Sequence, residues 1–245
     1  MNCFVAATAL VFGILLSSLK AEETRYRTFT ADPAEVHVFW LDPAGKRFGQ
    51  LSQLQRFLTS KSLEVKMLVN GGIFEPGGIP SGLLIADGKV AHPINLADGR
   101  GNFFLKPNGI VYVDESGSHI SSTAAYVAAS PSPRVAIQSG PLLLAKGQIH
   151  QTFRPASSSR LHRNGVGVLP GGKLLFAITE FGQPHYPNLY EFAEFFRQHG
   201  CRDALFLDGD LSQMETAPIN KLAPGNFFGS LIAVIGKPKT SGGDP

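Results

Sequence analysis

The sequence predicts an α+β fold: a single domain with a mixed, mostly antiparallel sheet, several β-hairpins and a few packed helices. Short apolar runs of strand length alternate with glycine-containing turns along most of the 245 residues, which is typical of β-hairpins. A few stretches instead repeat apolar residues with the helical period. No linker and no shift in composition divides the chain, so we expect its helices and strands to share one core.

The elements follow in chain order, each from its apolar pattern and its turn residues. In the first half they are a strand at His37–Leu41, a helix at Leu51–Ser60, a strand at Val65–Val69, and hairpin strands at Leu83–Ala86 and Phe103–Leu105 with turns at Asp87-Gly88 and Pro107-Asn108-Gly109. In the second half they are a short helix at Ser122–Ala129, hairpin strands at Leu142–Ala145, Gly165–Leu169 and Leu174–Thr179, a helix at Asn188–His199, and strands at Ala204–Leu207 and Leu231–Ile235.

The helix at Asn188–His199 has the strongest local signature. Asn188 is a good N-cap, and Glu191 follows three residues later in a capping-box arrangement. Gly200 is expected to end the helix in a left-handed conformation. One apolar stripe is made by Leu189, Phe192, Ala193 and Phe196.

The first 21 residues are predicted to be a secretory signal peptide. Phe4 to Leu19 is an apolar run, and cleavage is expected after Ala21. The run is short for a membrane-spanning helix, which needs about 20 apolar residues. A retained N-terminal anchor is the alternative, because no basic residue precedes the run and the bulky Leu19 is the third residue before the cleavage point. Residues 22–236 are then the domain, and 237–245 are expected to be a disordered tail.

Charge and cysteine content exclude several classes of protein. Cleavage lowers the formal net charge from +3 to +2, because Lys20 is the only charged residue removed. So small a charge, without a basic cluster, argues against nucleic-acid binding, and no stable membrane span is expected after cleavage. Cys201 is then the only cysteine left, so no internal disulfide can form. Such an exported chain fits a bacterial periplasm or secretion.

The first candidate for a functional site is Asp208-Gly209-Asp210, which follows the apolar run Ala204–Leu207. Ligands of open sheets tend to bind at the carboxyl ends of strands. Two nearby carboxylates repel each other, which can raise the pKa of one and separate an acid role from a base role. The alternative is a simple Asp-Gly turn, although a turn alone does not account for the buried strand before it or for the polar Ser212 after it.

Three further stretches are candidates. Asn70-Gly71-Gly72 ends an apolar strand with a loop whose backbone could approach a ligand closely, and Ser139 joins two strand runs in a similar way. Arg160 and Arg163 precede a strand and could hold a phosphate through charge-assisted hydrogen bonds. Each could equally be an ordinary turn or a solvated loop. The histidines are scattered without the spacing of a zinc site.

Taken in order, these stretches resemble the phosphodiester glycosidase family. The family motifs are matched by Asn70-Gly71-Gly72 with Phe74, by Gln138-Ser139-Gly140-Pro141-Leu142-Leu143, loosely by Arg163-Asn164-Gly165-Val166-Gly167, and by Leu207-Asp208-Gly209-Asp210-Leu211-Ser212. Asp210 and Leu211 replace two family glycines, while His162 and Asn164 replace a proline and a threonine. The resemblance covers roughly residues 65 to 235 and suggests an exported bacterial branch of the family.

The resemblance implies a hydrolase that cleaves a sugar from a phosphodiester-type linkage. Asp208 would be the catalytic carboxylate and Arg163 the phosphate clamp, with Arg160 as a helper. Asp210 would be either a partner acid or a carboxylate that orients an arginine. The substrate-binding residues would be Asn70, Gly71, Gly72, Asn102, Ser139, Gly209, Asp210 and Ser212.

Two other functions stay open. One is a non-catalytic periplasmic protein that binds glycan or sugar phosphate in the same pocket. The other uses Asp208 and Asp210 as oxygen ligands of a divalent cation, although such cations normally need more carboxylates than two. No other cofactor is expected.

Overall fold

The computed structural model describes residues 25–182 and 184–236, and within them every strand pairing is antiparallel. The largest sheet runs, edge to edge, through β1 (Tyr26–Ala31), β14 (Leu174–Thr179), β13 (Asn164–Val168), β15 (Asp203–Asp208), β11 (Leu142–Ala145) and β12 (Gln148–Ile149). The second sheet runs through β7 (Lys89–His92), β6 (Leu84–Ala86), β10 (Val135–Ser139), β8 (Gly109–Asp114) and β9 (Gly117–Ser122). The third runs through β16 (Met214–Thr216), β3 (Val65–Asn70), β17 (Leu231–Ile235) and β2 (Val36–Phe39). A small hairpin pairs β4 (Phe74–Glu75) with β5 (Ile79–Pro80).

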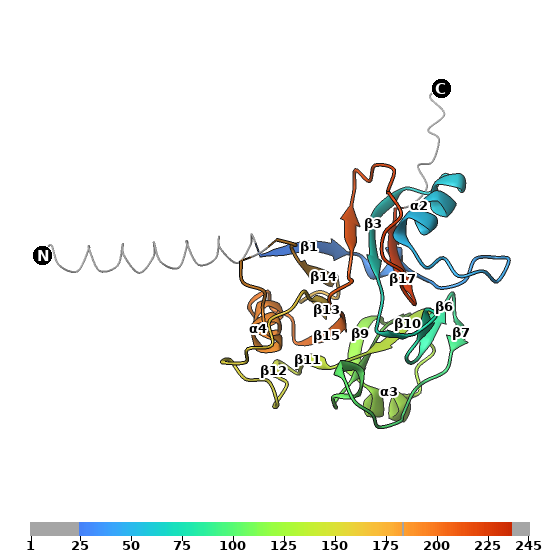
Figure 1. The fold of residues 1–245 in the computed structure, drawn as a ribbon. Helices are drawn as coiled ribbons and strands as arrows, with labels where there is room; N and C mark the ends of the chain where they lie inside the picture. Colours follow the sequence, from blue (N-terminus) through green and yellow to red (C-terminus); the bar gives the residue numbers. More distant parts are fainter. Residues whose placement is uncertain (1–24, 183, 237–245) are drawn as a thin grey trace, which may run out of the picture.

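The three large sheets share one central core. Val69 of β3, Ile137 of β10 and Leu205 of β15 are all buried in the same apolar cluster, although each belongs to a different sheet. Removing apolar surface from water in this way is the main favourable contribution to folding. Figure 1 shows the strands of the three sheets coming together near the middle of the molecule, where this core lies.

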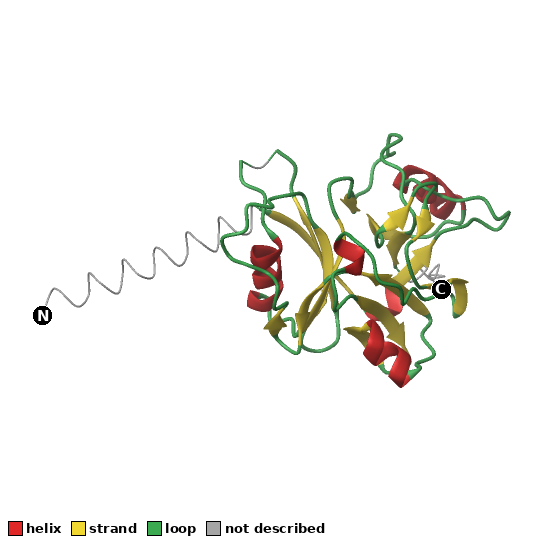
Figure 2. Ribbon diagram, turned by 60° about the horizontal axis from the view of Figure 1, so that its bottom comes forward, coloured by secondary structure: helices red, strands yellow, loops and turns green. Residues whose placement is uncertain are grey.

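The outer face of each large sheet is covered by one helix. Leu54 of α2 (Leu51–Ser60) packs against the outer face of the third sheet. Tyr126 of α3 (Thr123–Ala129) packs against the second sheet, and Phe192 of α4 (Leu189–Gln198) packs against the first. Figure 2 shows these helices on the outside of the strands. The predicted α+β fold with hairpins and a few packed helices is confirmed.

Strand β15 is buried on both faces, as its apolar sequence predicts. Leu205 and Leu207 lie in the central core, whereas Ala204 and Phe206 lie in the cluster beneath α4. Because successive side chains of a strand point to opposite faces, a strand between a core and a helix must be apolar at every position. Asp208 is the first position at which the strand leaves these two layers.

Helix α4 begins as its sequence predicts, but only half of the capping box forms. The Asn188 Oδ1 accepts the Glu191 backbone N–H at 2.9 Å. The Glu191 carboxylate does not return to the N-cap and instead pairs with Arg25 and Arg160. Gly200, at a φ of +82°, follows the helix in the left-handed region that glycine tolerates best.

One predicted hairpin is wrong. Asn102–Phe104 form a short 3-10 helix, η2, where a strand at Phe103–Leu105 was expected. The Asn108 side chain donates to the Phe103 carbonyl oxygen at 3.0 Å. The expected turn at Pro107-Asn108-Gly109 is thereby hydrogen-bonded to this helix and does not reverse a strand. The hairpin instead forms further on, between β8 and β9. A second 3-10 helix, η1, spans Pro33–Glu35.

The predicted signal peptide and the predicted tail lie outside the described residues. Among residues 25–182 and 184–236, no helix has both the length and the apolar character that crossing a membrane requires.

Candidate functional site

The candidate site lies where the first and third sheets meet. Asp208 ends β15, and Asn164, its neighbour across the strand pair, begins β13. Asn70 ends β3 of the other sheet. The Asn164 side-chain amide donates to the Asn70 carbonyl oxygen at 3.1 Å and faces the Asn70 Oδ1 at 3.3 Å. Three strand ends that are far apart in sequence therefore bring polar side chains to one point.

The Asn70 side chain holds the Asp208 carboxylate in place. The Asn70 Nδ2 donates to the Asp208 Oδ2 at 3.3 Å and to the Ser212 Oγ at 3.2 Å. The Asn70 Oδ1 accepts the Gln213 backbone N–H at 2.9 Å, which fixes the orientation of the amide. Asn70 and Ser212 are both buried. A buried network of this kind restricts its members to one geometry.

Burial raises the pKa of Asp208 to about 6, and the nearby Asp210 charge adds to the increase. The Gly209 backbone N–H, which donates to the Asp208 Oδ1 at 2.8 Å, acts in the opposite direction. A carboxyl group with such a pKa is mostly ionised at neutral pH but takes up a proton in mild acid. That range is suited to general acid–base work.

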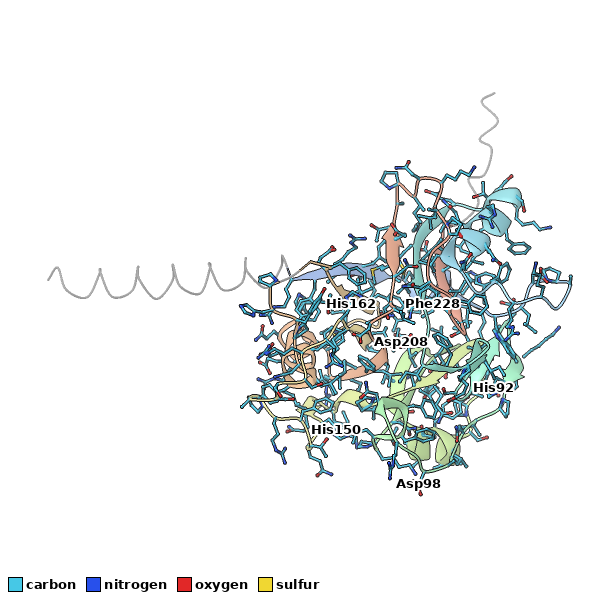
Figure 3. The ribbon with its side chains drawn as sticks, viewed as in Figure 1. His92, Asp98, His150, His162, Asp208 and Phe228 are labelled. Carbon is cyan, nitrogen blue, oxygen red and sulfur yellow. The ribbon has the colours of Figure 1, made fainter. Side chains whose placement is uncertain are left out.

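Asp208 opens onto a cleft of about 410 Å³. The residues lining it include Asn102, Arg163, Phe206, Asp208, Gly209 and Asp210. Figure 3 shows Asp208 near the middle of the molecule, away from its outer edges. The cleft thus brings together the carboxylate and the arginine that the sequence predicts to act together.

Arg163 is the main cationic feature of the cleft. It is 2% exposed, and its side chain donates to the carbonyl oxygens of Ser159 at 3.0 Å and Pro187 at 3.5 Å. The guanidinium lies 5.6 Å from the centre of the Phe206 ring. Burial lowers the pKa of Arg163 to about 10, so the group stays protonated at neutral pH. Within the part of the chain that the structure describes, Arg163 has no ion pair.

A buried guanidinium without a paired carboxylate is costly. Asp210 raises the pKa of Arg163 through its charge, although the two groups form no ion pair. A bound anion would supply the missing partner, and the planar fork of arginine suits phosphate in particular. Arg163 therefore makes the cleft a candidate anion site.

The predicted site residues fall into three groups. Asn102, Gly209 and Asp210 line the cleft with Asp208 and Arg163, while Asn70 and Ser212 lie behind the carboxylate. Gly71, Gly72 and Ser139 serve packing between strands. The Gly71 backbone N–H donates to the Ser230 carbonyl oxygen at 2.8 Å. A Cβ on Gly72 would lie only 3.0 Å from the Gln138 carbonyl oxygen. The Ser139 Oγ donates to the Leu207 carbonyl oxygen at 2.8 Å.

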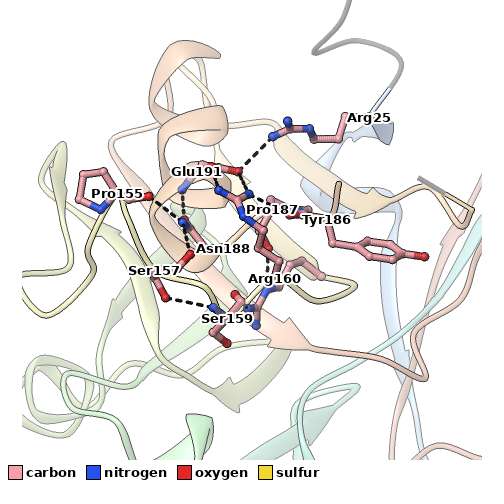
Figure 4. Close-up of polar contacts among 10 residues, drawn as sticks. Arg25, Pro155, Ser157, Ser159, Arg160, Tyr186, Pro187, Asn188 and Glu191 are labelled. Carbon is pink, nitrogen blue, oxygen red and sulfur yellow. Dashed lines mark hydrogen bonds and ion pairs between the residues drawn. The ribbon is translucent and has the colours of Figure 1, made fainter. Parts of the chain in front are cut away.

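Arg160 is engaged outside the cleft. Its guanidinium forms two hydrogen bonds with the Glu191 carboxylate, at 2.7 and 2.8 Å, and a third with the Tyr186 carbonyl at 3.1 Å. Arg25 contacts the same carboxylate at 3.2 Å, as Figure 4 shows. Arg160 does not line the cleft around Asp208; its contacts attach the loop before β13 to helix α4.

Two charged residues of the cleft were not singled out from the sequence. Glu75 of β4 lines the cleft, and its Oε1 accepts the Ser81 hydroxyl at 2.8 Å. Arg100 approaches from the loop before η2. Glu75 stands five residues after Asn70 in the same motif region, so its closeness to Asn70 in the sequence could have indicated that it belongs to the site. Nothing in the sequence around Arg100 indicates this position.

His162 supports the site from behind. Its Nε2 contacts the Ser212 carbonyl oxygen at 3.2 Å, and its ring stacks on Phe181 at 4.0 Å. Burial lowers the pKa of His162, so the ring is neutral at neutral pH. With Nε2 as the donor, His162 holds the turn that follows Asp208. Within residues 25–182 and 184–236, no three His, Cys, Asp or Glu side chains gather closely enough to hold a metal ion.

Comparisons with solved structures agree with this fold. The catalytic domain of zebrafish N-acetylglucosamine-1-phosphodiester alpha-N-acetylglucosaminidase, auto-inhibited by its pro-peptide, superposes with a TM-score of 0.59 at 18% identity over 86% of this chain and 83% of that one. A crystal structure of a Burkholderia pseudomallei K96243 protein titled "putative exported protein" superposes with a TM-score of 0.53 at 12% identity, over 86% of this chain and 74% of the other. At these identities the likeness concerns the fold alone.

Sequence comparisons identify the family. The uncharacterized protein YigE of Escherichia coli K12 is 32% identical over 191 residues, which is 77% of this chain and 73% of YigE. A family model described as phosphodiester glycosidase matches residues 64–223, a stretch that contains Asn70, Arg163 and Asp208. The resemblance drawn from the motifs is thereby confirmed, and this chain belongs to the phosphodiester glycosidase family.

Proposed function

We propose that this protein is an exported hydrolase that cleaves a sugar from a phosphodiester at the bond between the anomeric carbon and the phosphate oxygen. The observation that carries the proposal is that one cleft holds both the Asp208 carboxylate and the buried Arg163, which has no ion pair among the described residues. Export is supported by the apolar pattern of residues 1–21 and by the fold shared with a protein described as exported.

The reaction would proceed by water adding to the anomeric carbon. The carbon–oxygen bond breaks, the phosphate oxygen keeps the electron pair, and a free sugar and a phosphomonoester result. A proton of the attacking water passes to Glu75, to Asp210 or to solvent. Phosphate is a good leaving group, so less general-acid assistance is required than for an ordinary glycoside.

Asp208, Arg163 and the further carboxylates of the cleft each have a part in this scheme. The ionised Asp208 would stabilise positive charge that develops at the anomeric carbon, and Arg163 would stabilise the departing phosphate. Glu75 and Asp210 are the further carboxylates of the cleft, and either could accept the proton of water. Asn70 and Ser212 act indirectly, because they position Asp208.

The test is hydrolysis of a panel of sugar-1-phosphodiesters, beginning with those of N-acetylglucosamine, by the wild type and by Asp208→Asn. The substitution is nearly isosteric, so we expect ground-state binding to stay within a few-fold while turnover falls at least a hundredfold. Asp87→Asn, on the exposed turn between β6 and β7, is the matched control and should retain wild-type turnover. If the wild type binds these diesters but hydrolyses none, the protein is a binding module for sugar phosphates.

A further inference from the structure

A second hollow adjoins the cleft and shares Arg163 with it. This hollow has a volume of about 640 Å³, and its lining includes Leu105, Thr152, Arg154, Ser158, Arg163 and Tyr190. We name it the serine-loop hollow, after the loop Ser157–Ser159 that forms one side. Neighbouring residues line the two spaces, since Phe104 faces the cleft and Leu105 faces the hollow. A ligand group at Arg163 would therefore border both.

The serine-loop hollow is a built feature of the fold. The buried Asn188, which caps α4, also donates its side-chain amide to the carbonyl oxygens of Pro155 at 2.9 Å and Ser157 at 3.1 Å. The Ser159 backbone N–H donates to the Ser157 Oγ at 3.3 Å. Figure 4 shows these contacts tying the loop to the start of the helix. The loop is thus held in one arrangement before any ligand arrives, which lowers the cost of ordering it on binding.

The lining of the serine-loop hollow is cationic. Arg154 and Arg163 both contribute, and none of the lining residues is an aspartate or a glutamate. Arg154 donates its Nη1 to the Gln151 and Phe153 carbonyl oxygens, at 2.7 and 3.2 Å, and its Nη2 has no hydrogen bond or ion pair among the described residues. The exposed Ser158 and Thr152 add hydroxyl groups, of which the Thr152 Oγ1 also contacts the His150 Nδ1 at 2.9 Å. Guanidinium and hydroxyl groups together suit a ligand that carries both negative charge and hydroxyls.

We infer that the serine-loop hollow binds the second alcohol of the phosphodiester, and that this alcohol is a polyol carrying a further phosphate. The inference rests on the proposed function, because it places the scissile phosphate at Arg163. The sugar then occupies the cleft beside Asp208, and the second alcohol extends past Arg163 into the hollow. Arg154 binds the further phosphate there, and Thr152 and Ser158 contact the hydroxyls.

The test compares three diesters of N-acetylglucosamine 1-phosphate, made with methanol, with glycerol and with glycerol 3-phosphate. Values of kcat/KM are measured with the wild type, and Kd is measured by calorimetry with the inactive Asp208→Asn protein. We expect the glycerol 3-phosphate diester to bind about tenfold more tightly than the glycerol diester, because a charge-assisted contact is added. The methyl diester should bind most weakly of the three.

Variants assign the preference to the serine-loop hollow. Arg154→Gln should reduce the roughly tenfold preference to less than about twofold, whereas Arg56→Gln on the exposed face of α2 removes the same charge and should leave it unchanged. Ser158→Trp fills the hollow and should lower kcat/KM for the glycerol 3-phosphate diester more than for the methyl diester. Ser132→Trp, an exposed serine of the loop before β10, is its control.

The outcomes separate this inference from the proposed function. If the wild type hydrolyses none of the diesters, the proposed hydrolase activity is refuted. The order of the three Kd values still shows whether the serine-loop hollow binds the second alcohol and its further phosphate. Equal Kd values for the three diesters, or no measurable binding of the phosphorylated one, overturn the inference. A preference that Arg154→Gln leaves intact overturns it as well, since the further phosphate would then bind elsewhere.

Discussion

Asp208→Asn is predicted to stabilise the protein at neutral pH while it removes the proposed activity. The pKa of Asp208 is raised from 3.8 to about 6 by burial and by Asp210. Ionising it in the folded state at neutral pH therefore costs about 3 kcal/mol, at ~1.4 kcal/mol for each pKa unit. Asparagine avoids that cost, but its single oxygen can accept from only one of Gly209 and Asn70. The lost hydrogen bond costs about 1 kcal/mol, which leaves a net gain of about 2 kcal/mol.

The sign of the effect reverses in acid. A raised carboxyl pKa contributes stability that is fully present below the unfolded pKa of 3.8 and is lost as the pH rises toward the folded pKa of about 6. Between pH 7.5 and 4.5 the wild type should gain roughly 2 kcal/mol from this group, whereas Asp208→Asn gains nothing from it. The advantage of the variant should therefore vanish near pH 4.5.

Urea unfolding of both proteins at pH 7.5 and pH 4.5, followed by circular dichroism, measures this difference. Glu64→Gln replaces a carboxylate by an amide in the same way at an exposed position just before β3, and it should differ from the wild type by the same amount at both pH values. If Asp208→Asn is less stable than the wild type at pH 7.5, and by the same margin at pH 4.5, the reasoning is refuted. Asp208 would then be a structural hydrogen-bond acceptor whose ionisation in the folded protein costs no stability.

Three further predictions test other parts of the chain. Arg163→Lys should weaken diester binding at least tenfold, because a point charge cannot replace the planar fork; calorimetry measures it, with the exposed Arg202→Lys as control. Asn188→Ala should cost about 2–4 kcal/mol in urea unfolding, since it removes the α4 cap and two loop contacts, whereas Ser122→Ala, which removes the single cap bond of α3, should cost about 1 kcal/mol. Burial raises the pKa of the Cys201 thiol to about 12, so peptide mass mapping should find no alkylation of Cys201 at pH 8 until urea unfolds the protein.

The fold was largely predictable because its strongest signals are local. Leu51–Ser60 and Leu174–Thr179 have the boundaries that their apolar patterns predict, since one face of a helix or two faces of a buried strand must be apolar wherever they lie. Strand β9, Gly117–Ser122, carries serines and a histidine and gives no such pattern; only its pairing with β8 defines it. Phe103 and Phe104 are apolar like a strand but belong to a 3-10 helix, in which Phe103 lies against Gly82 and Phe104 lines the cleft, and a short apolar run cannot reveal this.

The candidate site gave its clearest sequence signals where polar residues follow strand ends. Asn70 and Asp208 stand out because each is the first polar residue after a buried run, and their hydrogen bond joins positions 138 residues apart. Gly71 and Gly72 gave the same signal for a different reason. They allow β10 and the residues before β17 to approach closely, so the sequence indicates the closeness of backbones without saying whether a ligand or another strand is the neighbour.

Asp208 and Arg163 line one cleft, yet they do not form the ion pair that would lower the cost of burying both charges. Burial disfavours the charged form of each, as the raised pKa of one and the lowered pKa of the other indicate. Asn70 fixes the carboxylate on one side, and the Ser159 and Pro187 carbonyls fix the guanidinium on the other, so packing keeps the two charges apart. A sugar phosphodiester between them would present its phosphate to Arg163 and its developing positive charge to Asp208. Such a ligand would relieve both costs most fully in the transition state, and that difference, rather than tight ground-state binding, is what accelerates a reaction.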